Sequence, residues 1–176
     1  MNQPKSLEQE IQELLDVAEI TRLKASYCFG CDGIPSSDVN QNRHVDYEMV
    51  ASLFTEDAEL DGVGRCLGRD AIREYYRGIQ RLPLAIHCVA TPLIEVNGDT
   101  ATGKWHGIIP LITAEDKVGA WLVGVYQDKF VRTSEGWKIK KLGFTPHFLT
   151  PAGESWATIR FLDPTYERRF GPKPEP

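Results

Sequence analysis

Residues Ile86–Ile109 read IHCVATPLIEVNGDTATGKWHGII, two β-prone runs on either side of the dipeptide Asn97-Gly98. Asn-Gly favours a two-residue type I′ turn, because both central positions of that turn need a positive φ. If these two residues form the loop, Val96 pairs with Asp99. The stretch therefore predicts a β-hairpin whose register decides which side chains share a face.

In this register the two faces of the hairpin differ in chemistry. His87 lies opposite Ile108, and His106 lies opposite Val89, so the two histidines and Lys104 point the same way. The other face is almost wholly apolar and carries Ile86, Cys88, Ala90, Ile94, Val96, Ala101, Trp105 and Ile109. We expect this apolar face to be buried and the titratable face to be available for chemistry.

Length and composition indicate one globular domain. The chain has 176 residues, of which 41% are hydrophobic and 10% aromatic, enough for a sizeable core. Its net charge of −5 argues against a nucleic-acid-binding protein, which needs a basic face. No apolar run approaches the ~20 residues of a membrane span, and the N-terminus does not resemble a signal peptide. We expect a cytoplasmic protein that binds neither membranes nor nucleic acids.

The four cysteines are Cys28, Cys31, Cys66 and Cys88. The Cys28-x-x-Cys31 spacing admits a zinc or redox interpretation. No second such pair accompanies it, however, and no predicted strand leads into it. The favoured interpretation is small, buried, reduced thiols.

The N-terminal region predicts two helices. Residues 7–15 form an amphipathic helix with Leu7, Ile11, Leu14 and Leu15 on one stripe. Asp16 and Glu19 have the spacing of a capping box, which predicts the start of a second helix that ends near Gly30. Asp32 follows directly, where its charge opposes the helix dipole, so it is either solvated or held in place for use.

The rest of the chain predicts helices at 47–54 and 68–79, a short strand at 59–61, and long strands at 119–132 and 137–144. The polar residues 34–46 form a solvated connector or a mobile lid. With the hairpin, the long strands predict an antiparallel meander. The fold class is therefore α+β, with a strongly curved, cone-shaped antiparallel sheet wrapped around N-terminal helices. Residues 156–162 predict an apolar or helical piece ahead of a frayed, proline-rich end.

Five phrases occur in a characteristic order: Ile20/Leu23/Tyr27/Asp32, Leu53–Ala58, Gly68–Ile72, His87 with Asn97–Gly103, and Tyr126–Arg132 with Gly136–Ile139. Together, over about residues 8–147, they resemble the SnoaL-like branch of the nuclear transport factor 2-like superfamily. The resemblance implies a curved sheet and helices that enclose a deep pocket, often in a dimer. We expect a SnoaL-like domain over residues 1–150 and a C-terminal extension over 151–176.

The chain is most similar to cofactor-independent dehydratases and eliminases of this branch, such as scytalone dehydratase, bile acid 7α-dehydratase and hexachlorocyclohexane dehydrochlorinase. Asp32 and His87 match the acid–histidine positions of these enzymes, and Tyr27 matches a pocket tyrosine. His106 falls where scytalone dehydratase has a second pocket histidine. Lys104 on the same predicted face and His147 after the last strand depart from the pattern, which leaves the substrate open.

This set of residues predicts acid–base chemistry without a metal or an organic cofactor. His87, oriented by Asp32, is a general base with a pKa near neutral. His106, Lys104 or Tyr27 would protonate a leaving oxygen or hold an oxyanion. Each also has a structural interpretation: a core histidine, a solvated lysine or a core tyrosine.

The expected substrate is a hydroxylated aromatic or polycyclic small molecule, which loses water or undergoes retro-aldol C–C cleavage. Deformylation of a lignin-derived diarylpropane diol is one example. The predicted substrate-binding residues are Trp105, Trp121, Tyr75, Tyr76, Phe144 and His147. We also expect a homodimer formed through the sheet, because a large exposed apolar face is unfavourable in water.

Two alternatives stay open. Zinc could bind His87, His106 and His147, although their spacing matches no motif. The chain could also be a non-catalytic small-molecule-binding or assembly subunit, because fold does not determine function. Arg132 and His44 are interpreted as a salt-bridge residue and an exposed loop residue.

Overall fold

A computed structural model describes residues 5–34, 37–38, 41–62, 64–159 and 161. The helices are α1 (Leu7–Asp32), α2 (Tyr47–Ser52) and α3 (Arg69–Ile79). The strands are β1 (Phe54–Asp61), β2 (Arg65–Leu67), β3 (Leu84–Ala85), β4 (Cys88–Asn97), β5 (Thr100–Ile112), β6 (Gly119–Thr133) and β7 (Gly136–Pro151).

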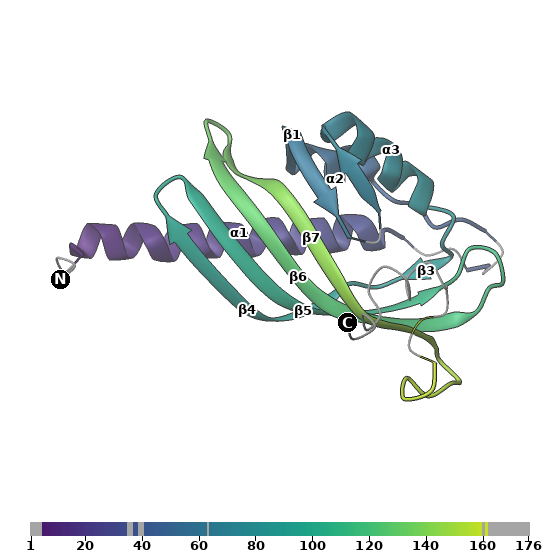
Figure 1. Ribbon diagram of the computed structural model, residues 1–176. Coiled ribbons are helices and arrows are strands. Elements are labelled where there is room, and N and C mark those ends of the chain that lie inside the picture. The colour runs from purple at the N-terminus through teal and green to yellow at the C-terminus, as the bar shows by residue number, and fades with distance from the viewer. Residues whose placement is uncertain (1–4, 35–36, 39–40, 63, 160, 162–176) are drawn as a thin grey trace, which may run out of the picture.

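The strands form one curved sheet, which confirms the predicted α+β class. The sheet has the order β2-β1-β7-β6-β5-β3, and β4 also pairs with β5. Among the described strands, β1 pairs with β7 in parallel and every other pairing is antiparallel. Figure 1 shows α1 crossing one face of the long strands, with α2 and α3 beside β1. The inner face of the sheet and the three helices thus enclose the core.

Strand alternation places one row of each long strand in this core. Along β6 the buried row is Ala120, Leu122, Gly124, Tyr126, Asp128 and Phe130. Along β5 it is Ala101, Gly103, Trp105, Gly107 and Ile109. From α1, Ile20, Tyr27 and Cys31 pack against these rows. The period-two pattern of both strands therefore sets what faces the interior.

The two predicted N-terminal helices are a single helix of 26 residues. Its capping box is formed by Ser6 and Gln9. Asp16, predicted as a cap, lies in the middle of the helix and is buried. Its carboxylate accepts hydrogen bonds from Arg132 Nη2 at 2.6 Å and Trp137 Nε1 at 3.2 Å. Asp16 joins α1 to the sheet, so the prediction of a helix start there is wrong.

The N-terminal half of α1 is largely exposed. Leu7, Ile11, Leu14 and Leu15 form the predicted apolar stripe, but each side chain is between 48% and 70% exposed. In Figure 1 the first turns of the helix extend past the end of the sheet. The stripe therefore contributes nothing to the core of this chain.

The turn of the β4–β5 hairpin lies one residue later than predicted. Asn97 pairs with Thr100, so Gly98 and Asp99 form the loop, and Gly98 has the positive φ of 58° that such a turn needs. The predicted pairing of Val96 with Asp99 is wrong, because Val96 pairs with Ala101.

A bulge further along β4 changes which face its side chains occupy. The register shifts between Ala90 and Leu93, around Thr91, which has a φ of 52°. Before the bulge, His87 and Val89 are partly buried, whereas after it the partly buried positions are even-numbered. The prediction that Ile86, Cys88 and Ala90 share the buried face with Ile94 and Val96 is therefore wrong, and those first three residues are exposed.

The bulge also separates the titratable residues that were predicted to share a face. His87 lies on the inner side of the sheet, whereas His106 and Lys104 are exposed on the outer side. Across the hairpin, His106 pairs with Ala90 and Lys104 with Leu93. The predicted common face for these three side chains is wrong, because one extra residue reverses the alternation of β4.

Other segments differ in smaller ways. In the region predicted as a polar connector or lid, Arg43 and Val45 are buried, and residues 35–36 and 39–40 lie outside the described part. Residues 156–158 form a turn rather than a helix, and the proline-rich end lies outside the described residues. No helix in the described ranges is long and apolar enough to cross a membrane.

Candidate active site

Asp32 and His87 form a tight pair at the C-terminal end of α1. One carboxylate oxygen, Asp32 Oδ1, lies 2.6 Å from His87 Nδ1 and accepts the His87 backbone N–H at 2.8 Å. Both side chains are mostly buried, at 18% and 12% exposure. Of the two alternatives for Asp32, solvated or held in place, the structure shows the second.

The contact sets the protonation of the imidazole. An ionised carboxylate only accepts hydrogen bonds, so Nδ1 carries the proton and Nε2 carries the lone pair. Burial lowers the pKa of His87 below its usual 6.5, while the hydrogen bond and charge of Asp32 act in the opposite direction. His87 is thus a neutral imidazole at neutral pH, with Nε2 able to accept a proton.

His87 faces a small interior cavity of about 70 Å³ between α1, α3 and the inner sheet face. The lining residues are Tyr27, Leu60, Gly62, Tyr75, Tyr76, Ile79, His87, Ile109, Leu122, Tyr126, Leu142 and Phe144. The rings of Tyr27 and His87 meet edge to face, with centroids 6.1 Å apart. The wall is thus aromatic and aliphatic, with His87 as its basic group.

Tyrosine hydroxyls supply the other polar atoms of the cavity wall. Tyr76 donates a hydrogen bond to the Tyr27 oxygen at 3.0 Å. Burial raises the pKa of Tyr27, Tyr76 and Tyr126 well above the usual 10.0. These hydroxyls stay protonated, so they are hydrogen-bond donors and poor acids.

The predicted site residues divide into three groups. Tyr27, Tyr75, Tyr76 and Phe144 line the cavity with His87. Trp105 is buried but packs on Phe130, with ring centroids 6.0 Å apart. Four others are exposed on the sheet: His106, Lys104, Trp121 and His147. The structure thus brings the Asp32–His87 pair together with the tyrosines, and places those four elsewhere.

A buried ion pair beside the cavity was not predicted. Lys24 Nζ lies 2.8 Å from Asp128 Oδ2 and 3.4 Å from the ring centroid of Tyr126, and both charged side chains are at most 1% exposed. Burial raises the pKa of Asp128, against the effect of Lys24. Lys24 occupies a core position in the helical pattern of α1, and Asp128 occupies a core position in the strand alternation of β6. A charged residue in an otherwise apolar row is the signal that could have identified each of them.

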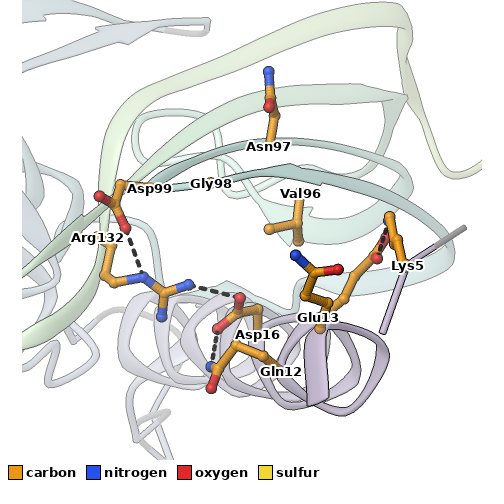
Figure 2. Close-up of a pocket in the computed structure, with 10 residues that line it drawn as sticks. Lys5, Gln12, Glu13, Asp16, Val96, Asn97, Gly98, Asp99 and Arg132 are labelled. Carbon is orange, nitrogen blue, oxygen red and sulfur yellow. Dashed lines mark hydrogen bonds and ion pairs between the residues drawn. The ribbon is translucent and has the colours of Figure 1, made fainter. Parts of the chain in front are cut away.

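A larger hollow lies elsewhere, between α1 and the β4–β5 turn (Figure 2). It is an open groove of about 680 Å³, in which Arg132 joins Asp16 to Asp99 and Lys5 pairs with Glu13. Arg132 is therefore a salt-bridge residue. Because these charges neutralise each other, the groove offers less chemistry than the smaller cavity, and we place the candidate site at His87.

The structure also bears on the metal alternatives. Across the described residues, no group of three or more His, Cys, Asp or Glu side chains is arranged to hold a metal ion. His87 lies inside the sheet, while His106 and His147 are exposed. Burial raises the pKa of Cys28 to about 11 and that of Cys31 further, so both are unreactive thiols.

Comparison with known proteins identifies the family. The SnoaL-like domain matches residues 12–143, and the chain belongs to this family. Over 134 residues it is 31% identical to an uncharacterized protein of Mycobacterium tuberculosis, an alignment that covers 73% of this chain and 84% of that one. The resemblance predicted from the ordered motifs is therefore confirmed.

Solved structures support the fold. Hexachlorocyclohexane dehydrochlorinase type 3 from Novosphingobium barchaimii superposes with a TM-score of 0.68 at 22% identity, over 82% of this chain and 96% of that one. A protein from Novosphingobium aromaticivorans, named provisionally as a scytalone dehydratase, gives a TM-score of 0.66 at 22% identity, over 81% and 97%. At this identity the likeness concerns architecture, and chemistry must be argued from the site.

Proposed function

We propose that this protein is a cofactor-independent lyase in which His87, held by Asp32, is the general base. The observation that carries the proposal is the 2.6 Å contact between Asp32 Oδ1 and His87 Nδ1 at the wall of an aromatic cavity. Two of its structural neighbours are named as a dehydrochlorinase and, provisionally, a scytalone dehydratase, both names for elimination enzymes.

The proposed step is an elimination. His87 Nε2 removes a proton from the carbon next to the one that bears the hydroxyl group. The electron pair of that C–H bond forms a C=C bond, and the C–O bond breaks. Because the tyrosines are poor acids, the imidazolium returns the same proton to the departing oxygen, which leaves as water. Tyr27, whose own oxygen accepts the hydrogen bond of Tyr76, donates its hydroxyl proton in a hydrogen bond to this oxygen as negative charge develops on it.

A retro-aldol cleavage is the second reaction that this base supports. There Nε2 takes the hydroxyl proton, the C–C bond breaks, and a small aldehyde such as formaldehyde is released. In a diarylpropane diol, the example of this reaction, the electron pair of that bond forms a C=C bond and expels the neighbouring hydroxyl group, which leaves as water with the proton taken up by His87. Product analysis separates the two reactions, since only this one releases an aldehyde.

The cavity restricts the substrate. Its volume of about 70 Å³ is smaller than the ~150 Å³ apolar cavity that holds benzene in an engineered protein. Even one aromatic ring therefore needs the wall to move, and Tyr75 and Ile79 of α3 are only partly buried. We propose a hydroxylated aromatic substrate whose reacting side chain, rather than a fused ring system, reaches His87.

The test is turnover of a panel of aryl alcohols and aryl diols, followed by mass spectrometry. His87→Gln and Asp32→Asn should each lower kcat/KM by about 10²–10⁴-fold, the usual contribution of a general base. His106→Gln is the matched control, because that histidine is exposed on the outer face, and it should retain full activity. Full turnover in both site variants would exclude the proposal.

The second candidate is a non-catalytic binding subunit, which the closed aromatic cavity also fits. A binding subunit would gain thermal stability with small aromatic ligands and leave them chemically unchanged. Formation of any product that depends on His87 would exclude it.

We also propose a homodimer, but through a different surface from the one predicted. The inner hairpin face is covered by α1, whereas the outer face exposes Ile86, Leu93, Ile108 and Trp121 at 39–57%. Apolar groups of this size on one sheet face favour association.

A further inference from the structure

Arg43 is 1% exposed and lies in the segment between α1 and α2. Its Nη1 atom donates to two backbone carbonyls, those of Asp32 and Ala85, each at 3.1 Å. Asp32 is the last residue of α1, and Ala85 ends β3 two residues before His87. One nitrogen therefore joins the two segments that carry the proposed base and its carboxylate.

The backbone delivers Arg43 to this position. Ile34 and His44 exchange two backbone hydrogen bonds of 2.9 Å, which closes the segment just beyond α1. At Gly33, with a φ of 61°, a Cβ atom would lie 2.0 Å from the His44 carbonyl oxygen, so only glycine permits this crossing. Val45 is fully buried beside it. The entry of Arg43 into the interior is thus built into the chain path.

The charge of Arg43 has a use at this place. Asp32 is an anion at the negative end of the α1 dipole, and α1 has no basic residue in its last turn. Arg43 supplies the missing cation. Within the described structure its Nε and Nη2 atoms have no hydrogen-bond partner. Unpaired donors are costly to bury. A neutral amide side chain could donate to the same two carbonyls and would leave fewer donors unpaired than the guanidinium does. The guanidinium charge itself therefore needs an explanation.

Three charged groups act on the imidazole of His87. Asp32 favours its protonated form, whereas Arg43 and Lys24 oppose protonation. Tyr27 lies against the ring but stays neutral, because burial raises its pKa. Burial is the largest effect that lowers the pKa of His87, and Arg43 adds to it by offsetting part of the effect of Asp32, so the carboxylate can orient an imidazole that stays neutral.

We propose that Arg43 is a positioning residue for the Asp32–His87 pair: its forked hydrogen bond sets the spacing of the two segments, and its charge adds to burial in keeping His87 neutral at rest. This inference rests on the proposed function of His87 as a base. It extends the site to a residue that touches neither the substrate cavity nor the imidazole.

The test is NMR titration of the histidine side chains in the full-length protein, which needs no substrate. Arg43→Gln removes the charge and keeps an amide donor, while Arg43→Lys keeps the charge and loses the fork. In Arg43→Gln the midpoint of His87 should move to higher pH. In Arg43→Lys it should stay near that of the unmodified protein, while the downfield Nδ1 proton signal of His87 shifts as the pair loosens.

Arg69→Met is the matched control. Arg69 also donates to a backbone carbonyl, Phe54 O at 3.0 Å, but it is not among the charges that act on His87. In Arg69→Met the titration midpoint of His87 should be unchanged. If Arg43→Gln does not fold, Arg43→Lys still tests the fork through the Nδ1 signal.

With an identified substrate, Arg43→Lys should lower kcat by up to about 10²-fold, the effect of a 1 Å misplacement, with KM little changed. An unchanged or lowered His87 midpoint in Arg43→Gln, or an unchanged Nδ1 signal in Arg43→Lys, would overturn the inference. If the proposed function itself fails, the result is different: the His87→Gln variant keeps its turnover, whatever the NMR titration of the Arg43 variants shows.

Discussion

The Asp32–His87 contact uses one oxygen for two donors, the imidazole and the main chain of the same residue. The double contact restrains both the ring and the strand that bears it. The pair is the part of the site that the sequence predicted, because the family resemblance supplied both residues. The predicted tyrosines Tyr27, Tyr75 and Tyr76 of the helices also line the cavity. The prediction for His106 and Lys104 depended on the hairpin register, and that register was wrong.

The pH dependence of activity follows from the state of His87. The base must be neutral, and burial lowers its pKa below 6.5, so kcat/KM should be constant at neutral pH and fall about tenfold per pH unit below that pKa. Steady-state kinetics from acid to neutral pH measure this. An acid limb centred above 6.5 would contradict it.

The same shift affects folding. Because the pKa of His87 is lower in the folded than in the unfolded protein, the unfolded state binds more protons as the pH falls. The contribution of His87 to stability is therefore complete above pH 6.5 and is lost below it. In His87→Gln, denaturation midpoints should depend less on pH in that range.

The Lys24–Asp128 pair should matter greatly when one partner is removed. Lys24→Met leaves a buried, uncompensated carboxylate and should lower the free energy of unfolding by about 3–5 kcal/mol. The double variant Lys24→Met/Asp128→Leu should recover much of this loss, because apolar groups need no partner. Urea denaturation measures both. A double variant no more stable than the single one would contradict the argument.

At the scale of elements, α1 shows what local patterns can and cannot reveal. The second predicted helix, from Asp16 to near Gly30, covers the half of α1 that is buried, with Ile20 and Tyr27 in the core. The break at Asp16 was wrong, since its carboxylate accepts hydrogen bonds from Arg132 on β6 and Trp137 on β7, each more than a hundred residues away. Such a partner is invisible to a local pattern.

The hydrogen bonds from Arg132 and Trp137 to Asp16 give a prediction for α1. Asp16→Ala leaves Arg132 Nη2 and the Trp137 indole N–H without their acceptor and should lower the free energy of unfolding by about 1–3 kcal/mol. The pKa of Asp16 lies below 3.8 because Arg132 donates to it, so the difference should vanish on acidification below that pH. The exposed Glu10→Ala is the matched control and should change little.

For the whole molecule, the outer sheet face should determine the oligomeric state. Light scattering should give twice the chain mass of 19.8 kDa. Trp121→Glu places a charge among the exposed apolar groups and should shift the protein to a monomer. Gln127→Glu adds the same charge on the same strand, at an exposed position that is already polar, and should leave the dimer intact. A monomer before mutation would contradict the proposed dimer.

The extra residue in β4 has a consequence for the ancestry of this site. Because the inner positions are odd before the bulge and even after it, loss of the codon for Thr91 would straighten β4 and leave His87 on the inner side. If the residue is kept and the strand pairs without a bulge, every side chain before Thr91 changes face at once and Cys88 replaces His87 at the cavity. Among homologues that keep the inward histidine, a chain one residue shorter in this stretch should therefore have a regular strand here, and a chain of the same length should have the bulge.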